Sequence, residues 1–389
     1  MIDYSRVLNS RVKEIKPSGI RKFFDIAATM EDVISLGVGE PDFQTPWAIR
    51  KAGITSLERG KTKYTSNRGL NMLREEISGY VNRKTGIKYN SESEILVSVG
   101  GSEAIDVALR AIVSEGEEVI IPQPSYVCYE PITVLTGGVP RIIETKAEND
   151  FKITPQELKA AITPKTKALI LPYPCNPTGA VMERADLEKI AEILKNTDII
   201  VISDEIYSEL TFTGSGHTSI AEIDGMRERT VLVSGFSKAF SMTGWRLGYA
   251  CGPEEIIAAM TKIHQFAIMC APTTAQYAAV EALRSGEEAV ANMKAEYDRR
   301  RRLMVAGFNR IGLACREPKG AFYTFPSIKS TGLSSEEFCE KLLKTERVAV
   351  VPGTAFGKGG EGFVRASYCY SAEHIIEALK RIERFLKTL

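Results

Sequence analysis

Lys238 is the residue of this sequence whose surroundings are best suited to covalent chemistry. It lies in the segment SGFSKAFSMTGWRLGYA, where its neighbours Phe236, Ala239 and Phe240 are apolar. Burial disfavours the charged form of a lysine, and a nearby cation such as Arg246, eight residues later, acts in the same direction. We therefore expect Lys238 to present the neutral amine that forms an imine with a carbonyl compound.

The lysine segment resembles a known cofactor-binding signature. Its pattern S-x-x-S-K-x-F-x-M-x-G-W-R-x-G is similar to that of the class I and II, fold-type-I, pyridoxal-phosphate-dependent aminotransferases, in particular the broad aspartate and aromatic branch. The resemblance runs from SLGVGEPDFQTP at residues 35–46 to FVRASY at residues 363–368. It implies that pyridoxal 5′-phosphate is the cofactor and that Lys238 holds it as a Schiff base.

Four polar or aromatic residues match further cofactor contacts of that family. A pyridoxal ring needs a carboxylate against its pyridine nitrogen, because the protonated nitrogen lets the ring accept electrons. The resemblance assigns this role to Asp204, which follows the apolar run IIVIS in the phrase DEIY. It also implies that Tyr207 of DEIY and Asn176 of NPTG contact the phenolic oxygen, and that Tyr126 stacks on the ring.

The cofactor phosphate is expected where SVGGSEAIDVALRAIV turns from a strand into a helix. Backbone N–H groups at the start of a helix bind anions. The candidate residues there are Gly101, Ser102 and Glu103. By resemblance, Arg246 adds a positive charge and a serine of the lysine segment adds a hydroxyl group, with Ser234 and Ser237 both open. Tyr64, in KYTSNRG, resembles the tyrosine that reaches the phosphate of the neighbouring subunit, which implies a homodimer.

Arg365, in FVRASY, is the expected contact for the substrate α-carboxylate. A planar guanidinium group offers two parallel donors to a carboxylate. By resemblance, the backbone of Gly39 and the side chain of Asn176 lie beside the same substrate. Three residues are expected to contribute apolar surface to the pocket: Ile20, Phe23 and Tyr126. An aromatic donor and an aspartate-like donor both remain open, and the resemblance implies 2-oxoglutarate as the acceptor.

The elements around these motifs predict an α/β fold. Between residues 94 and 250, short β-branched runs alternate with amphipathic stretches, which is typical of a mainly parallel sheet with helical crossovers. Seven strands are predicted, at residues 95–99, 118–121, 141–145, 168–171, 199–203, 231–234 and 247–250. Helices are expected to begin after Thr154 and Ser334, since each has a glutamate three residues later.

The length of 389 residues exceeds what one hydrophobic core usually holds, so two domains are expected. We predict a large cofactor-binding domain at residues 46–285 and a small α+β domain at 286–389, with residues 1–45 packing against the small domain.

The sequence GKGGEG at 357–362 has the letters of a dinucleotide-binding loop. A strand rather than a helix is expected after it, which predicts an ordinary turn.

Composition argues against several other functions. Fifty basic and forty-nine acidic residues leave no excess charge for nucleic acid, and the run 299–302 of four arginines is expected to be a solvated helix face. No segment has the length and apolarity of a membrane span, and the amino terminus does not resemble a signal peptide. Seven cysteines without a C-x-x-C pair favour the cytoplasm, and the three histidines lack metal-ligand spacing.

Two other functions remain open at this point. A carbon–sulfur β-lyase uses the same cofactor and fold, because a carbanion at the substrate Cα can also expel a thiol. A non-catalytic pyridoxal-binding regulator is the third possibility, although residues 1–35 are too short for an attached DNA-binding module. The sequence favours amino-group transfer from an L-amino acid to a 2-oxo acid.

Overall fold

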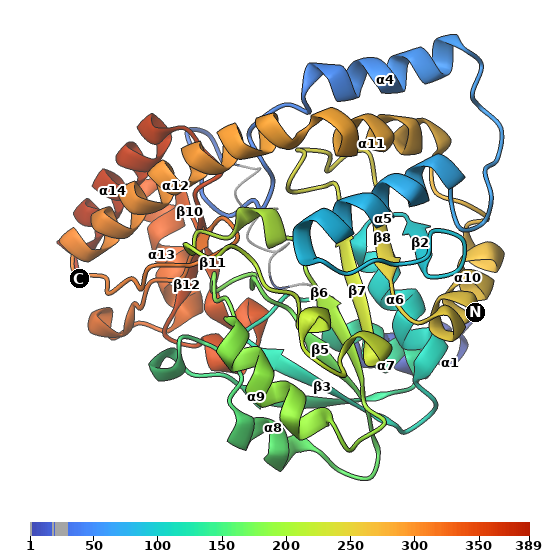
Figure 1. Cartoon of the computed structure of the whole chain (residues 1–389). Coiled ribbons are helices and arrows are strands. Elements are labelled where there is room, and N and C mark those ends of the chain that lie inside the picture. Colours follow the sequence, from blue (N-terminus) through green and yellow to red (C-terminus); the bar gives the residue numbers. More distant parts are fainter. Residues whose placement is uncertain (1, 18, 20–29) are drawn as a thin grey trace.

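The larger sheet of the protein has seven strands. The computed structural model describes residues 2–17, 19 and 30–389, and Figure 1 shows this sheet surrounded by helices. The strand order is β2 (Ile95–Ser98), β8 (Gly248–Cys251), β7 (Thr230–Gly235), β6 (Ile200–Asp204), β5 (Thr166–Leu171), β3 (Glu118–Gln123) and β4 (Val139–Glu144). Only β8 runs antiparallel to its two neighbours. The seven predicted strands and the mainly parallel sheet are confirmed.

Both faces of this sheet are covered by helices. Along β5, Ala168 and Ile170 pack in a core with α6 (Gly101–Ile112) and α10 (Glu254–Ala267), whereas Leu169 and Leu171 pack with α8 (Pro155–Ala161) and α9 (Arg184–Leu194). Successive side chains of a strand point to opposite faces, so an apolar run is required where both faces are covered. Each leucine or isoleucine side chain that is fully buried in this way contributes about 1.5–3 kcal/mol. The other helices of this part are α4 (Trp47–Glu58), α5 (Asn71–Thr85), α7 (Tyr129–Thr136) and α11 (Thr273–Ser285).

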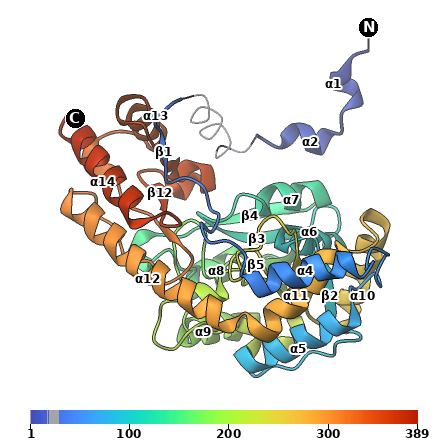
Figure 2. The ribbon, with the colours of Figure 1, turned by 90° about the horizontal axis from the view of Figure 1, so that it is seen from above.

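A smaller sheet lies at the other end of the molecule, as Figure 2 shows. Its antiparallel strands are β11 (Val351–Pro352), β12 (Val364–Ser367) and β9 (Tyr323–Thr324), and β1 (Ile34–Ser35) pairs separately with β10 (Val348–Ala349). Three helices surround these strands: α12 (Glu287–Arg310), α13 (Ser335–Glu346) and α14 (Ala372–Leu386). The capping boxes at Thr154 and Ser334 are present as predicted. The segment 357–362 forms a short turn and is followed by the strand β12 and not by a helix, as predicted.

The amino-terminal segment has two short helices, α1 (Tyr4–Val7) and α2 (Ser10–Glu14). They project from the body of the protein in Figure 2, and Arg11 of α2 pairs with Glu115 just before β3.

Within the parts of the chain described here, no helix is both long and apolar enough to span a membrane. The domain limits 1–45, 46–285 and 286–389 stay predictions.

The arginine run on α12 differs from its prediction. Arg300 and Arg301 are 7% and 6% exposed, so the predicted solvated face is wrong for these two residues. Arg300 pairs with Asp42 and Glu296, and Arg301 pairs with Asp298 and Glu317. Buried guanidinium groups are tolerated when carboxylates satisfy them, and two of these four partners are distant in sequence. The flanking residues 299 and 302 are exposed as predicted.

Candidate functional site

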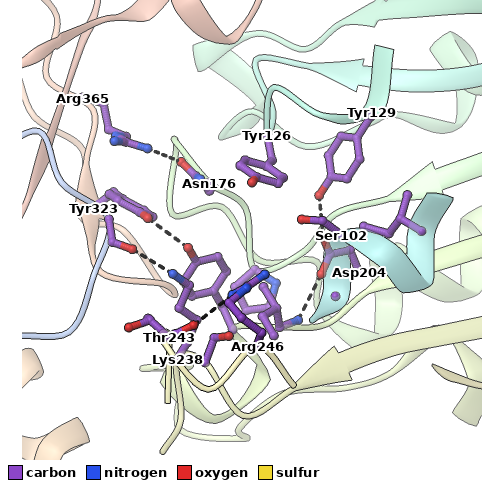
Figure 3. Close-up of a pocket in the computed structure, with 17 residues that line it drawn as sticks. Ser102, Tyr126, Tyr129, Asn176, Asp204, Lys238, Thr243, Arg246, Tyr323 and Arg365 are labelled. Carbon is purple, nitrogen blue, oxygen red and sulfur yellow. Dashed lines mark hydrogen bonds between the residues drawn. The ribbon is translucent and has the colours of Figure 1, made fainter. Parts of the chain in front are cut away.

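A pocket of about 300 Å³ lies where the carboxyl ends of β6 and β7 face the smaller sheet (Figure 3). Most of the predicted site residues line it: Gly39, Gly101, Ser102, Tyr126, Asn176, Asp204, Tyr207, Ser237, Lys238, Arg246 and Arg365. Ligand sites of α/β proteins are typically found at the carboxyl ends of the strands. The fold therefore collects, at one point, residues from seven separate motifs of the sequence.

Lys238 follows the end of β7 and its side chain is largely buried. Its Nζ donates a hydrogen bond to the carbonyl oxygen of Gly39 at 2.8 Å and lies 5.7 Å from the centre of the Phe322 ring. Burial lowers the pKa of Lys238 from 10.5 to about 8, and the charges of Arg365 and Arg246 act in the same direction. The amine is thus close to neutral at mildly alkaline pH, as predicted for this lysine.

Asp204 is the last residue of β6 and its carboxylate is buried. Its Oδ2 accepts a hydrogen bond from the Tyr129 hydroxyl at 2.7 Å, and its Oδ1 accepts one from the backbone N–H of Ile206 at 3.2 Å. Burial raises the pKa of Asp204, whereas these two hydrogen bonds favour the ionised form and lower it. A partly satisfied carboxylate therefore faces the pocket from the sheet.

The start of α6 and Arg246 form a positive corner of the pocket. Gly101 and Ser102 are the first two residues of α6, whose first N–H groups have no partner within the helix. The preceding Gly100 has φ 83°, and a Cβ atom there would lie 2.7 Å from Nη2 of Arg246. This glycine lets the guanidinium approach the helix start closely, which creates a site suited to an anion.

Three predicted cofactor contacts do not line the pocket. The Glu103 carboxylate accepts a hydrogen bond from the backbone N–H of Val99 and pairs with Nδ1 of His264 at 2.6 Å. The Ser234 hydroxyl is buried and donates to the carbonyl oxygen of Glu205 at 3.4 Å. Tyr64 is 83% exposed. Of the two serines left open by the sequence, Ser237 is the one at the pocket wall.

The opposite side of the pocket holds Arg365, which is 3% exposed. Its Nη1 donates to Oδ1 of Asn176 at 2.8 Å and its Nη2 donates to the carbonyl oxygen of Gly37. Its Nε has no hydrogen-bond partner among the described residues. The guanidinium lies between the rings of Tyr323 and Phe356, at 4.4 and 4.7 Å from their centres. This cation is held rigidly and retains an unused donor.

Three pocket residues that carry a hydroxyl group were missed in the sequence. Tyr129 stands three residues after Tyr126 in QPSYVCYE, and Thr243 stands five residues after Lys238. Their positions beside recognised motifs were a usable signal. Tyr323, whose hydroxyl lies 2.9 Å from that of Tyr207, had none, because its contacts come from distant segments. Two predicted pocket residues, Ile20 and Phe23, lie outside the described residues.

The residues of the pocket fit a phosphate-bearing pyridine aldehyde. Lys238 offers an amine of lowered pKa to the aldehyde, and Asp204 offers a buried carboxylate to a ring nitrogen. The corner formed by the start of α6 and Arg246 offers N–H groups and a positive charge to a phosphate. The class I and II aminotransferases, as a family, depend on a cofactor of this kind.

Comparison with known proteins agrees with this geometry. A family model described as "Aminotransferase class I and II" matches residues 31–382. The Bacillus subtilis protein described as "Putative aminotransferase YugH" is 56% identical over 97% of this chain and 98% of that protein. The aspartate aminotransferase of Pyrococcus abyssi is 48% identical over 98% of both chains.

A solved structure gives the same result for the fold. The aromatic aminotransferase from Pyrococcus horikoshii superposes with a TM-score of 0.90 at 47% sequence identity, over 94% of this chain and 99% of that chain. This chain belongs to the class I and II aminotransferase family and is an enzyme that transfers amino groups.

Proposed function

We propose that this enzyme uses pyridoxal 5′-phosphate to move the amino group of an aromatic or aspartate-like L-amino acid to a 2-oxo acid, with 2-oxoglutarate as the acceptor. The observation that carries the proposal is the presence of Lys238, with a pKa of about 8, and the buried carboxylate of Asp204 in one pocket. A lysine amine and a carboxylate are the two side chains that pyridoxal chemistry requires.

The cofactor would be held by groups on every side of the pocket. Lys238 would hold its aldehyde carbon and Asp204 its ring nitrogen. Tyr126 would lie against the ring, and Tyr207 and Asn176 would contact the phenolic oxygen. Four residues would bind the phosphate: Gly101, Ser102, Ser237 and Arg246. When bound, the cofactor supplies an electron sink for the negative charge that develops at the substrate Cα.

The chain's own residues would then perform three tasks. Once the substrate amine has displaced it from the cofactor, the Lys238 amine would remove the proton from the substrate Cα, a task for which a pKa near the working pH is best suited. Arg365 would bind the substrate α-carboxylate through its guanidinium, beside the backbone of Gly39. Asp204 would hold the ring nitrogen, and the hydrogen bonds from Tyr129 and the backbone of Ile206 would favour its ionised form against the effect of burial.

The donor class follows from the walls of the pocket and from the relatives. The pocket includes Ile105, Tyr126 and Tyr323, which offer apolar and aromatic surface to a large side chain. The family resemblance implies that some aspartate-using members carry a lysine at the position of Ser102, so this chain has no charge there to select a dicarboxylate. The relatives include an aspartate aminotransferase and an aromatic aminotransferase. We therefore propose that both donor classes are accepted.

A homodimer is proposed on the basis of Tyr64 and the surface around it. Tyr64 and Phe266 are 83% and 85% exposed, and Asn67 donates a hydrogen bond to the carbonyl oxygen of Met269, which joins the two segments. Large exposed apolar patches mark protein interfaces. In this arrangement Tyr64 would reach the phosphate in the partner's pocket.

The seven free cysteines support a cytoplasmic location.

A half-reaction screen tests the proposed function. Each amino acid is added to the cofactor-loaded enzyme without a 2-oxo acid, and the absorbance of the bound cofactor is followed together with ammonia and thiol. Conversion of the cofactor to its pyridoxamine form identifies the donor and supports the proposal. Release of ammonia with the original spectrum restored would instead establish a β-lyase. No change with any amino acid would favour a non-catalytic role.

A further inference from the structure

The segment 36–45, here called the strap, crosses the pocket between the smaller sheet and the lysine segment. At one end, the backbone N–H of Ser367 donates to the carbonyl oxygen of Leu36 at 2.7 Å. At the other end, the Thr45 hydroxyl donates to the carbonyl oxygen of Ser241 at 2.6 Å. The strap is therefore tied to both sides of the pocket, and its middle part has to be held by other contacts.

Two backbone carbonyl groups of the strap contact the two cations of the site. The carbonyl oxygen of Gly37 accepts a hydrogen bond from Arg365, and that of Gly39 accepts one from Lys238 at 2.8 Å. A Cβ atom on Gly39 would lie 2.1 Å from the Tyr323 hydroxyl, so the strap packs against this side chain without room to spare. The position of the strap therefore sets the surroundings of both cationic groups.

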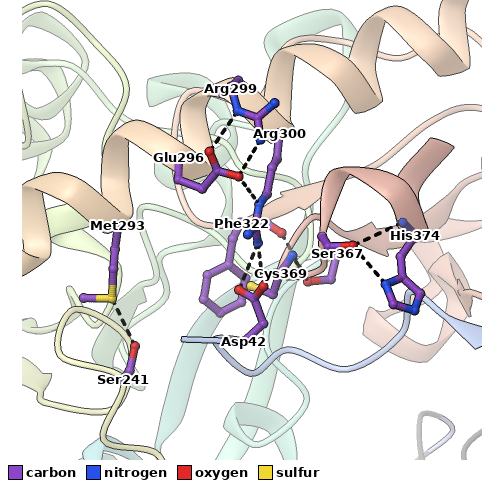
Figure 4. Close-up of polar contacts among 11 residues, drawn as sticks. Asp42, Ser241, Met293, Glu296, Arg299, Arg300, Phe322, Ser367, Cys369 and His374 are labelled. Atoms are coloured by element: carbon purple, nitrogen blue, oxygen red, sulfur yellow. Dashed lines mark hydrogen bonds and ion pairs between the residues drawn. The ribbon is translucent and has the colours of Figure 1, made fainter. Parts of the chain in front are cut away.

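Asp42 anchors the middle of the strap to α12, as Figure 4 shows. Nη1 of Arg300 lies 2.9 and 2.8 Å from the two carboxylate oxygens of Asp42, and its Nε donates to Glu296 at 2.7 Å. The Phe43 ring packs edge-on against Tyr297 at 5.3 Å, and the Arg300 guanidinium lies 5.2 Å from the centre of the Phe43 ring. The Arg300 side chain is 8% exposed and the Asp42 side chain 30%, so solvent screens this pair only in part.

We propose that Arg300 is a positioning residue for substrate binding in this enzyme. Through Asp42 it fixes the strap, and the strap in turn fixes the carbonyl groups of Gly37 and Gly39 against Arg365 and Lys238. The proposal rests on the proposed function of the site, since it assigns Arg365 to the substrate carboxylate. Arg300 does not line the pocket and acts only through other residues.

Arg301 provides a matched control on the same helix. Its side chain is 7% exposed, and it pairs with Asp298, Glu317 and the carbonyl oxygen of Pro318. It is thus as buried and as well paired as Arg300, but none of these three partners belongs to the strap. Loss of either arginine removes a buried ion pair and should lower stability to a similar degree. Only loss of Arg300 should release the strap.

The first experiment compares Arg300→Met and Arg301→Met by hydrogen–deuterium exchange and by steady-state kinetics with 2-oxoglutarate as acceptor. In Arg300→Met we expect faster exchange in peptides covering residues 36–45, because opening of a segment follows from loss of its contacts. We also expect the KM for 2-oxoglutarate to rise about 10- to 100-fold with a smaller fall in kcat, as for a small misplacement of a binding group. Arg301→Met should leave strap exchange and KM within about twofold of wild type.

Two further variants keep the test decisive if Arg300→Met does not fold. Asp42→Asn removes the charge on the strap, at a side chain that is 30% exposed, and should reproduce the rise in KM. Arg300→Lys retains a cation for Asp42 without the second bond to Glu296, so its KM should lie between those of wild type and Asp42→Asn. Adding Asp42→Asn to Arg300→Lys should raise the KM no further than Asp42→Asn alone, because both changes act through one contact.

Equal strap exchange and equal KM in the Arg300 and Arg301 variants would overturn the proposal, as would KM increases that simply multiply in the double variant. The exchange measurement does not depend on turnover. If the half-reaction screen found no amino-group transfer, the proposed function would fail, while strap exchange would still decide whether Arg300 holds the strap.

Discussion

The pocket has two walls that are built in different ways. The sheet wall consists of Gly101, Ser102, Asp204, Ser237 and Lys238, each of which stands within a few residues of a strand end or a helix start. The strap wall consists of Gly39, Tyr323 and Arg365, which come from three distant segments and are held by contacts between those segments. The first wall is therefore fixed by the large sheet itself, and the second by tertiary contacts. Changes in the sheet wall should abolish chemistry, whereas changes in the strap wall should mainly weaken binding.

Lys238→Ala is the strongest test of the sheet wall. Without the amine there is no base for the substrate Cα, and we expect kcat to fall by at least about 10³-fold. The cofactor should still bind through the remaining contacts, which dialysis followed by absorbance measurement can check. Lys262→Ala, a change at an exposed lysine of α10, serves as the control. Full activity in Lys238→Ala would remove Lys238 from the mechanism.

Asp204→Asn keeps the shape of the side chain and removes its charge. Because the carboxylate is buried and faces the pocket, we expect kcat to fall by about 10²-fold, as for loss of a preorganised electrostatic contact. Steady-state rates at saturating substrate give this value directly. An unchanged kcat would show that the protonation of the ring nitrogen does not depend on the charge of Asp204. Asp204 would then not belong to the residues of the sheet wall that the chemical step requires.

The buried Lys238 should also affect stability in the cofactor-free protein. Its pKa is about 8 when folded and 10.5 as an ordinary lysine, so between these pH values the unfolded chain binds a proton that the folded chain does not. The free energy of unfolding should therefore rise with pH across this window, by about 3 kcal/mol in total. Urea unfolding at pH 7 and pH 10.5 should show this rise in wild type, and the rise should be smaller by that amount in Lys238→Met.

Arg365→Lys tests the strap wall. A lysine supplies a single point charge in place of a planar two-donor face, so we expect the KM for both substrates to rise about 10- to 100-fold with a smaller change in kcat. Arg316→Lys, at an exposed ion pair with Asp150, provides the control. A fall in kcat as large as that of Asp204→Asn would mean that the two walls do not divide binding from chemistry.

Tyr129→Phe should have the smallest effect of the series. The Tyr129 hydroxyl lowers the pKa of Asp204, so its removal raises that pKa, and the acid limb of the kcat profile should move to higher pH. Near neutral pH the loss should be about fivefold, which corresponds to the net contribution of one intramolecular hydrogen bond, about 1 kcal/mol. Tyr173→Phe removes another buried hydroxyl, bonded to the carbonyl oxygen of Phe151, and should leave the pH profile unchanged.

Site residues that directly follow a strand could be predicted from the sequence. Asp204 could be predicted because DEIY stands directly after an apolar run, and strands of a parallel sheet present their carboxyl ends at one edge. Ser237 could not be separated from Ser234, because the choice depends on the path of the chain after β7. Tyr323 and the burial of Arg300 depend on contacts with residues far away in the sequence, and no local pattern records such contacts.

The close packing of Gly39 against the Tyr323 hydroxyl has a consequence for enzyme engineering. Any side chain at position 39 needs the space that the tyrosine ring and hydroxyl occupy, since a Cβ atom would lie 2.1 Å from that oxygen. Libraries that vary position 39 alone should recover few substitutions, because Tyr323 still occupies the space that a side chain at 39 needs. Randomising both together lets a smaller residue at 323 compensate a larger one at 39, and reshapes the substrate chamber without altering the lysine or its carboxylate partner.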